Sequence, residues 1–206
     1  MCLITLAGYL LASFSSSVQI SRLIYGSDIR EYGSGNPGAT NILRIFGWKA
    51  ALAVFIVDAG KGGISALLAP RLQFADVSFP PGLLQFVAGA AAVIGHCYPL
   101  FAEFRGGKGV ATAAGALLVV HPVAVALCSG VFMAVLIASR KVSVAAMVAS
   151  LSMPVLLLML RHRFGYEVPS SNLWIATGLA VFIVFTHRSN IVRLWSGNEG
   201  KLGAGG

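Results

Sequence analysis

The sequence predicts an all-α, polytopic membrane protein with seven transmembrane helices. Of its 206 residues, 57% are hydrophobic and only 11% are charged, and the mean hydropathy of +0.82 lies outside the range of soluble domains. Apolar runs long enough to cross roughly 30 Å of hydrocarbon recur along the chain. The basic residues lie mostly between these runs and form no stripe with interleaved aromatic residues, which argues against nucleic acid as a partner. We therefore expect residues 1–206 to form one domain embedded in a lipid bilayer.

Seven apolar segments are predicted to span the bilayer. The run that opens the chain resembles a signal peptide, but it has no basic start and becomes apolar again at Val18, so we expect a retained first span. The fourth segment is short, and its extension into the fifth around His121 and Pro122 would give six spans instead. The approximate spans are 3–24, 48–68, 81–101, 110–120, 123–139, 144–160 and 173–186.

The distribution of Lys and Arg predicts the orientation, because short cytoplasmic loops carry the excess of positive charge. With seven spans, eleven of the fifteen basic residues fall on one side, Arg71, Arg161 and Arg163 fall on the other, and Lys61 lies within a span. This asymmetry favours an amino terminus outside and a carboxyl terminus inside. It also brings four polar segments to the cytoplasmic face, namely 33–44, 105–109, 140–143 and 187–193.

A glycine-rich loop at 33–44 lies between two apolar spans and ends in a basic residue, Arg44. Its glycines, among them Gly35 and Gly38, allow positive φ and close backbone approach. Asn36 is a favoured N-cap and Pro37 a favoured first helical residue, so we expect a helix to begin here and to offer unpaired N–H groups to an anion. The loop therefore predicts a phosphate cradle, with a plain surface turn as the alternative. Further side-chain donors come from Ser34, Thr40 and Asn41.

The match of this loop to G-x-G-x-x-G is not a dinucleotide fingerprint, because no strand precedes it and another apolar span follows. A second glycine-rich turn, 104–109, leads directly into the apolar segment at 110. It adds two cations to a predicted helix N-terminus and therefore indicates a second anion site, although it lacks the Walker A pattern. Its site residues are Arg105, Gly106, Gly107, Lys108 and Gly109.

Three ionisable residues are predicted at membrane depth. Asp58 and Lys61 are three residues apart, so they share a helical face and can pair. Such groups are costly in a bilayer and normally face a polar interior, and a supporting role against the cradle is one interpretation. His96 is either a hydrogen-bonded supporting residue or a substrate contact. The cysteines show neither metal nor disulfide spacing, and we expect no metal and no cofactor.

Five motifs in order resemble the bacterial membrane acyl-phosphate:glycerol-3-phosphate acyltransferases, the PlsY family. They are G-S-G-N-P-G-A-T-N-x-L-R at 33–44, D-x-x-K-G at 58–62, G-H-x-x-P at 95–99, F-R-G-G-K-G-V-A-T at 104–112 and H-R-x-N-I-x-R-L at 187–194. The resemblance covers nearly the whole chain. It implies a seven-helix enzyme of phospholipid synthesis that transfers an acyl group from acyl-phosphate to the 1-hydroxyl of sn-glycerol 3-phosphate, giving lysophosphatidate and phosphate.

The same resemblance implies roles for individual residues. Acyl-phosphate is expected on 34–41 and glycerol 3-phosphate near the catalytic candidates Arg44, Lys108, Ser143, His187 and Asn190, with Arg193 as a further binding residue. No site for coenzyme A or a nucleotide is expected. Two departures stand out: 12–15 read A-S-F-S where G-S-I-P is common, and the fourth motif has F-R-G-G in place of F-K-G-G. Apart from Glu199, we assign no role to the tail from Gly197 onward.

Two other functions are alternatives to acyl transfer. A transporter of phosphate or phosphate esters would distribute polar groups across the bilayer, whereas here they cluster on one face. A metal-dependent phosphotransferase would need several aspartates on one segment, which this chain lacks. For the acyltransferase we expect direct attack by the acceptor hydroxyl, because the adjacent His96 and Cys97 do not face each other on a helix and no acidic residue completes a catalytic triad. Either a substrate phosphate oxygen or His187 would accept the proton.

Overall fold

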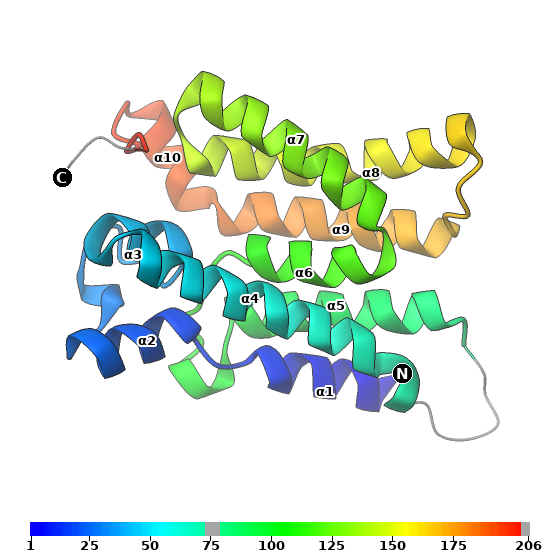
Figure 1. Ribbon diagram of the computed structural model, residues 1–206, viewed down its shortest axis with the longest axis horizontal. Coiled ribbons are helices and arrows are strands. Elements are labelled where there is room, and N and C mark those ends of the chain that lie inside the picture. Colours follow the sequence, from blue (N-terminus) through cyan, green and yellow to red (C-terminus); the bar gives the residue numbers. More distant parts are fainter. Residues whose placement is uncertain (73–78, 203–206) are drawn as a thin grey trace. The chain divides into compact units, whose positions relative to one another are not determined.

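The computed structural model describes residues 1–72 and 79–202, and over those two ranges it is built of helices with no β-strand (Figure 1). The all-α prediction is confirmed for this part of the chain. Short 3-10 helices cover Ile29–Glu31, Ala69–Leu72 and Leu100–Ala102. The α-helices are α1 (Cys2–Ala12), α2 (Ser16–Tyr25), α3 (Ala39–Phe46), α4 (Trp48–Leu68), α5 (Pro81–Cys97), α6 (Val110–Val120), α7 (Pro122–Ser139), α8 (Val142–Phe164), α9 (Ser170–Thr186) and α10 (Arg188–Trp195).

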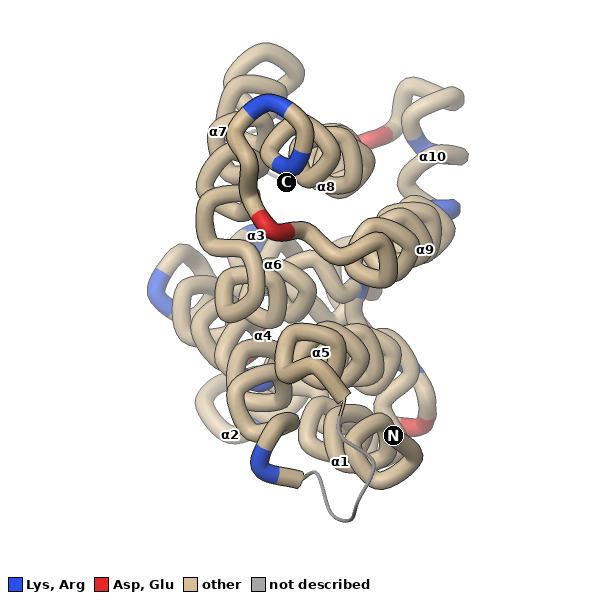
Figure 2. Tube along the Cα trace, turned by 90° about the vertical axis from the view of Figure 1, so that its right-hand side faces the viewer, with Lys and Arg blue, Asp and Glu red and all other residues tan. Residues whose placement is uncertain are grey.

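Five segments of the described chain are long and apolar enough to cross a membrane, and charged positions are sparse along their helices (Figure 2). They are Cys2–Tyr25, Trp48–Leu72, Pro81–Ala102, Pro122–Ser139 and Val142–Phe164. A sixth is formed if α9 and α10, which are bent by 55° at their junction, count as one span. Helix α6 is apolar but has only 11 residues. The structure thus supports a multi-pass membrane protein, while the count of seven spans stays a prediction.

The predicted boundaries agree closely with the helices. The segments 48–68 and 110–120 coincide with α4 and α6, and 123–139 differs from α7 by one residue. The fourth and fifth segments form separate helices, because α6 ends at Val120 and α7 begins at Pro122, with His121 between them. Whether the chain has six or seven spans stays a prediction. Proline at the first helical position is favourable, since it has no N–H to leave unpaired.

The chain divides into two compact units, Met1–Val120 and His121–Gly206. In the first, α4 packs against α6, α1 packs against α5, and α3 lies on α4. Small residues bring α4 and α6 together: a Cβ at Gly62 would overlap the backbone of Thr112, and one at Gly115 would overlap the backbone of Ala59. Such close backbone contact is the usual means of helix association in lipid, where apolar burial adds little.

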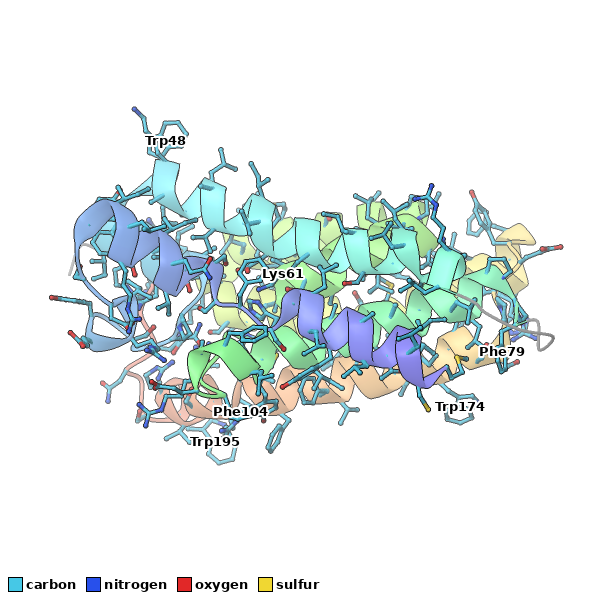
Figure 3. The ribbon with its side chains drawn as sticks, turned by 90° about the horizontal axis from the view of Figure 1, so that it is seen from below. Trp48, Lys61, Phe79, Phe104, Trp174 and Trp195 are labelled. Atoms are coloured by element: carbon cyan, nitrogen blue, oxygen red, sulfur yellow. The ribbon has the colours of Figure 1, made fainter. Side chains whose placement is uncertain are left out.

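The first span is interrupted between α1 and α2. Ser15 caps α2, its hydroxyl oxygen accepting a hydrogen bond from the N–H of Val18 at 3.5 Å. Lys61 of α4 donates to the backbone carbonyl of Phe14, in the interruption, at 2.9 Å. An unpaired carbonyl at membrane depth would cost several kcal/mol, so this bond stabilises the interruption. Figure 3 shows the labelled side chain of Lys61 among the helices of the first unit.

In the second unit, α7 packs against α8 and α8 against α9, and α10 turns away from the end of α9. The side chains of His121 and Asn172 lie 3.0 Å apart and join the start of α7 to the start of α9. Near the other ends of these helices, the N–H of Leu202 donates to the carbonyl of Arg140 at 2.6 Å. The carboxyl-terminal segment is therefore folded back onto the connection between α7 and α8. The interpretation of 1–206 as one acyltransferase domain stays a prediction.

Candidate active site

The first glycine-rich loop is held by the buried side chain of Asn41, which is 1% exposed. Its Oδ1 accepts from the N–H of Ser34 at 3.0 Å, and its Nδ2 donates to the carbonyls of Tyr32 at 2.9 Å and Ile29 at 3.3 Å. Gly33 and Gly35 have φ of +58° and +70°, in the left-handed region that favours glycine. Asn41 thus holds the backbone of the loop in place. That its side chain also binds substrate stays a prediction.

The helix that follows this loop begins later than predicted. Gly38, not Asn36, is the N-cap of α3, and Ala39, not Pro37, is its first residue. The reason is that the carbonyl of Gly38 accepts the first helical bonds, from the N–H groups of Asn41 and Ile42 at 3.0 and 3.1 Å. Gly38 has φ of −145°, which is extended and open to any residue, so positive φ is not a reason for glycine at this position.

The start of α3 retains the features that suit an anion. Among the described residues, the N–H groups of Ala39 and Thr40 have no hydrogen-bond acceptor. The exposed side chains of Ser34 and Thr40 lie on the loop and on the first turn of the helix, and Arg44 extends from its last turn, also exposed. Unpaired N–H groups at the positive end of a helix dipole attract negative charge. Asn36 and Gly38 complete the turn before the helix.

The second glycine-rich loop folds back onto the end of α5. The N–H groups of Gly106 and Gly107 donate to the carbonyls of Cys97 and His96, both at 3.2 Å. Gly109 has φ of +82° and precedes the first residue of α6, as predicted. Arg105 is exposed and Lys108 is half-buried, so the loop carries its two cations on a backbone fixed to α5.

The two loops meet within the first unit. A Cβ placed on Gly107 would lie 3.1 Å from the carbonyl oxygen of Pro37, and it would overlap the ring of His96. A side chain here would therefore have to displace the ring of His96 and crowd the carbonyl of Pro37. We call this contact of Gly107 with Pro37 the loop junction. Of the four segments predicted to converge, these two are brought together by the structure of the first unit.

A buried polar group lies behind the loop junction. Asp58 and Lys61 pair at 3.0 Å, as predicted from their spacing, and both are almost fully buried. The Asp58 carboxylate also accepts from the hydroxyl of Ser16 at 2.6 Å. The Nδ1 atom of His96 lies 3.3 Å from the same carboxylate, at ion-pair distance but without hydrogen-bond alignment.

Sequence analysis missed the side chains that join the segment before the first loop to the segment before the second loop. Asp28 accepts from the N–H and the guanidinium of Arg30, and from the guanidinium of Arg22 at 2.8 Å. Arg30 also donates to the carbonyl of Ala102 at 3.3 Å, at the end of the 3-10 helix that precedes the second loop. The hydrogen bond from Arg30 lowers the pKa of Asp28 from 3.8 to about 2. An acidic residue two positions before an arginine was the only local signal.

The second unit gathers the remaining candidates around a carboxylate. Glu199 Oε1 accepts from the hydroxyl of Ser143 at 2.5 Å and from the amide of Asn190 at 2.7 Å, while Oε2 accepts from Arg193 Nε at 2.9 Å. Burial alone would raise the pKa of Glu199, but these three hydrogen bonds lower it overall. Sequence analysis set Glu199 apart from the rest of the tail but named no function for it. Nothing local predicted it, because Ser143 is far away in the sequence.

His187 is buried between α9 and α10, with its Nδ1 2.8 Å from the carbonyl oxygen of Ile183. A carbonyl oxygen only accepts, so Nδ1 carries the hydrogen in this contact. In the neutral imidazole, Nε2 is then the accepting nitrogen, which is the form required of a base. Among residues 1–72 and 79–202, no group of three or more His, Cys, Asp or Glu side chains is placed to hold a metal.

Fold and site define a multi-pass membrane protein with paired glycine-rich loops suited to an anionic ligand. The sequence profile of the glycerol-3-phosphate acyltransferase family matches residues 2–197. The chain belongs to this family, the PlsY family to which its five motifs point.

The similarity extends over the whole chain. The glycerol-3-phosphate acyltransferase of Chlorobaculum tepidum is 39% identical over 98% of this chain and 96% of its own length. The glycerol-3-phosphate acyltransferase of Salinibacter ruber is 41% identical over 97% of this chain and 91% of its own length. The crystal structure of PlsY, an integral membrane glycerol 3-phosphate acyltransferase, in its glycerol 3-phosphate form is 36% identical with a TM-score of 0.84, covering 98% of this chain and 95% of PlsY. Its lysophosphatidic acid form has a TM-score of 0.81 at 35% identity.

Proposed function

We propose that this protein transfers a fatty acyl group from acyl-phosphate to the 1-hydroxyl of sn-glycerol 3-phosphate. The products are lysophosphatidate and inorganic phosphate, in the first acylation of phospholipid synthesis. The observation that carries the proposal is the loop junction, where two cation-bearing, glycine-rich loops of a family member lie against each other. Two phosphate-bearing substrates must react side by side, and two adjacent anion sites supply that arrangement. The family membership supports glycerol 3-phosphate as the acceptor.

In this proposal, the first loop binds the phosphate of acyl-phosphate. The N–H groups of Ala39 and Thr40, the hydroxyl of Ser34 and the charge of Arg44 are the groups available to it. Hydrogen bonds between cations and phosphate are roughly twice as strong as neutral ones, and they help the phosphate leave as negative charge develops on it. Lys108, Arg105 and the backbone of 106–109 form the second cation-bearing group.

We assign contacts with glycerol 3-phosphate to the polar side chains of the second unit as well, on the basis of the family motif. Ser143, Asn190 and Arg193 already share one anion, the carboxylate of Glu199, so their donors are oriented together. His187 has the tautomer of a proton acceptor. Loss of the shared carboxylate in Glu199→Gln tests this assignment.

The proposed reaction is a single displacement. The glycerol 3-phosphate hydroxyl oxygen forms a bond to the acyl carbonyl carbon, and the bond from that carbon to the phosphate oxygen breaks. The hydroxyl proton goes to a substrate phosphate oxygen or to Nε2 of His187. A covalent acyl-enzyme is not required, because phosphate is a good leaving group once its charge is neutralised. The buried positions of Cys97 and Cys128 support this direct route.

We also propose that the protein has seven spans, with its amino terminus outside and its carboxyl terminus inside a bacterial inner membrane. Helix α6 serves as the short span in this arrangement. The acyl-phosphate donor is a membrane-soluble substrate, and the active site lies on the cytoplasmic face, where the excess of Lys and Arg falls. We expect neither coenzyme A nor nucleic acid to bind.

The test uses purified protein with acyl-phosphate and glycerol 3-phosphate, following phosphate release and lysophosphatidate formation together. Acyl-coenzyme A replaces acyl-phosphate in a parallel reaction. Both products in equal amounts from acyl-phosphate, with no turnover of acyl-coenzyme A, are the expected result. Turnover of acyl-coenzyme A at a similar rate would contradict the donor assignment. If the protein in vesicles moved glycerol 3-phosphate across the membrane and formed no lysophosphatidate, it would instead be a transporter.

A further inference from the structure

His96, close to the end of α5, has a different neighbour at each edge of its ring. The Nδ1 edge faces the carboxylate of Asp58 on α4 at 3.3 Å. The Nε2 edge lies against Gly107, so closely that a Cβ there would overlap it. The side chain is only 7% exposed, so the ring fills the space between α4 and the loop junction. The ring is therefore largely shielded from solvent.

The carboxylate on the far side of the ring is itself fixed. Asp58 is bound by Lys61 at 3.0 Å and by the hydroxyl of Ser16 at 2.6 Å, and Lys61 is bound to the carbonyl of Phe14 at 2.9 Å. These contacts come from α4, α2 and the interruption after α1. Asp58 therefore forms a rigid support behind the ring of His96, and it stays paired when the ring is removed.

The backbone at the same position holds the second loop. The carbonyl of His96 accepts from the N–H of Gly107, and the carbonyl of Cys97 accepts from the N–H of Gly106, both at 3.2 Å. The loop is thus attached to α5 by its backbone, while the ring limits how far Gly107 can move toward α4. On the other side of Gly107 lies the carbonyl of Pro37, in the first loop.

We propose that His96 is a positioning residue, which sets the spacing between the two glycine-rich loops without contacting either substrate. The inference rests on the proposed function, because the spacing matters only if the loops hold two reacting phosphate compounds. Removing the ring leaves the N–H groups of Ala39 and Thr40 and the cations of both loops in place. Each substrate then binds as before, but the two are no longer held at reacting distance.

This role makes a specific kinetic prediction. In His96→Ala, kcat is expected to fall roughly tenfold or more, while the KM values for acyl-phosphate and glycerol 3-phosphate change by less than about threefold. In His96→Gln, whose amide reaches about as far as Nε2, at least half of the lost kcat should return. The exposed His162→Ala on α8 is the matched control and should behave as wild type. A raised KM with unchanged kcat would show that His96 contacts a substrate and would overturn the proposal.

A second measurement tests the contact without relying on activity. Gly107→Ala introduces a Cβ against the ring of His96, so the thermal unfolding midpoint in detergent should fall. Combining it with His96→Ala should restore most of that loss, because the overlapping ring is gone. Additive losses in the double variant would contradict the contact, and wild-type kcat in folded His96→Ala would contradict the positioning role. If the wild-type protein itself failed to acylate glycerol 3-phosphate, the proposed function would fall while the unfolding result would stand.

Discussion

Glu199 binds Ser143 through a hydrogen bond of 2.5 Å that joins residues 56 positions apart, and the same carboxylate oxygen accepts from Asn190 at 2.7 Å. The other oxygen is bound by Arg193 at 2.9 Å. One carboxylate from the tail thus orients three side chains that the family resemblance predicts to be catalytic or to bind substrate. The tail is part of the candidate site.

Glu199→Gln should lower kcat/KM by about ten- to a hundredfold, because hydrogen bonds to a charged group contribute roughly 1.5–3 kcal/mol and the amide presents a donor where an acceptor is needed. The measurement is steady-state acyl transfer at saturating acyl-phosphate. Glu167→Gln, an exposed carboxylate on the connection between α8 and α9, is the control. Equal effects of the two substitutions would contradict an orienting role for Glu199.

Lys108→Ala and Arg44→Ala should each lower activity by roughly a hundredfold or more, since a lost charge-assisted contact with phosphate costs on the order of 2–4 kcal/mol in the transition state. Arg71 is an exposed residue after α4, and Arg71→Ala is expected to leave the activity almost unchanged. Activity is followed as phosphate release. If Arg71→Ala were as damaging as Lys108→Ala, the predicted orientation in the membrane would be wrong.

Gly35→Ala should abolish the use of acyl-phosphate, because alanine at a φ of +70° is strained and its Cβ would lie 3.3 Å from the carbonyl of Arg30. Gly38→Ala should be much milder, since φ there is extended and the nearest atom is the amide of Asn36, a flexible side chain. Initial rates at varied acyl-phosphate separate the two. Gly178→Ala, which meets open space on α9, is the control. Equal rates in the Gly35 and Gly38 variants would remove the argument for the cradle.

Acid should weaken the hydrogen bonds that Asp28 accepts from Arg22 and Arg30, in the segment before the first loop. The folded-state pKa of Asp28 is lowered from 3.8 to about 2, so its stabilising effect is complete above pH 3.8 and is lost as the pH falls toward 2. Glu199, whose pKa is also lowered from 4.5, changes in the same direction. The unfolding midpoint in detergent should therefore drop as the pH falls below about 4.5. In Asp28→Asn the drop should be smaller, and an unchanged drop would show that Asp28 contributes nothing.

A variant with Cys2, Cys97 and Cys128 all replaced by Ala should stay active within about threefold, because direct transfer uses no thiol. Intact-mass measurement after exposure to acyl-phosphate without acceptor should show no acyl group on the wild-type protein. Stoichiometric acylation that glycerol 3-phosphate removes would contradict direct transfer while leaving the overall reaction unchanged.

Local patterns in the sequence predicted most of the helical architecture. Hydropathy placed α4 at 48–68 and α6 at 110–120, because a helix in lipid satisfies its own backbone and needs a continuous apolar run. The pairing of Asp58 with Lys61 followed from a spacing of three residues on one helix. Family membership followed from five ordered motifs. Each of these depends only on residues close together in the chain, or on their order.

Contacts between distant residues were decided by the tertiary structure alone. One local detail also differed: the N-cap of α3 is Gly38 and not Asn36, because the carbonyl of Gly38 accepts the first helical bonds. The interruption of the first span is stabilised by Lys61, 47 residues from Phe14. The loop junction and the hydrogen bond from Ser143 to Glu199 likewise join segments far apart in the chain. No local periodicity records such pairs, because packing brings them together only after the helices have formed.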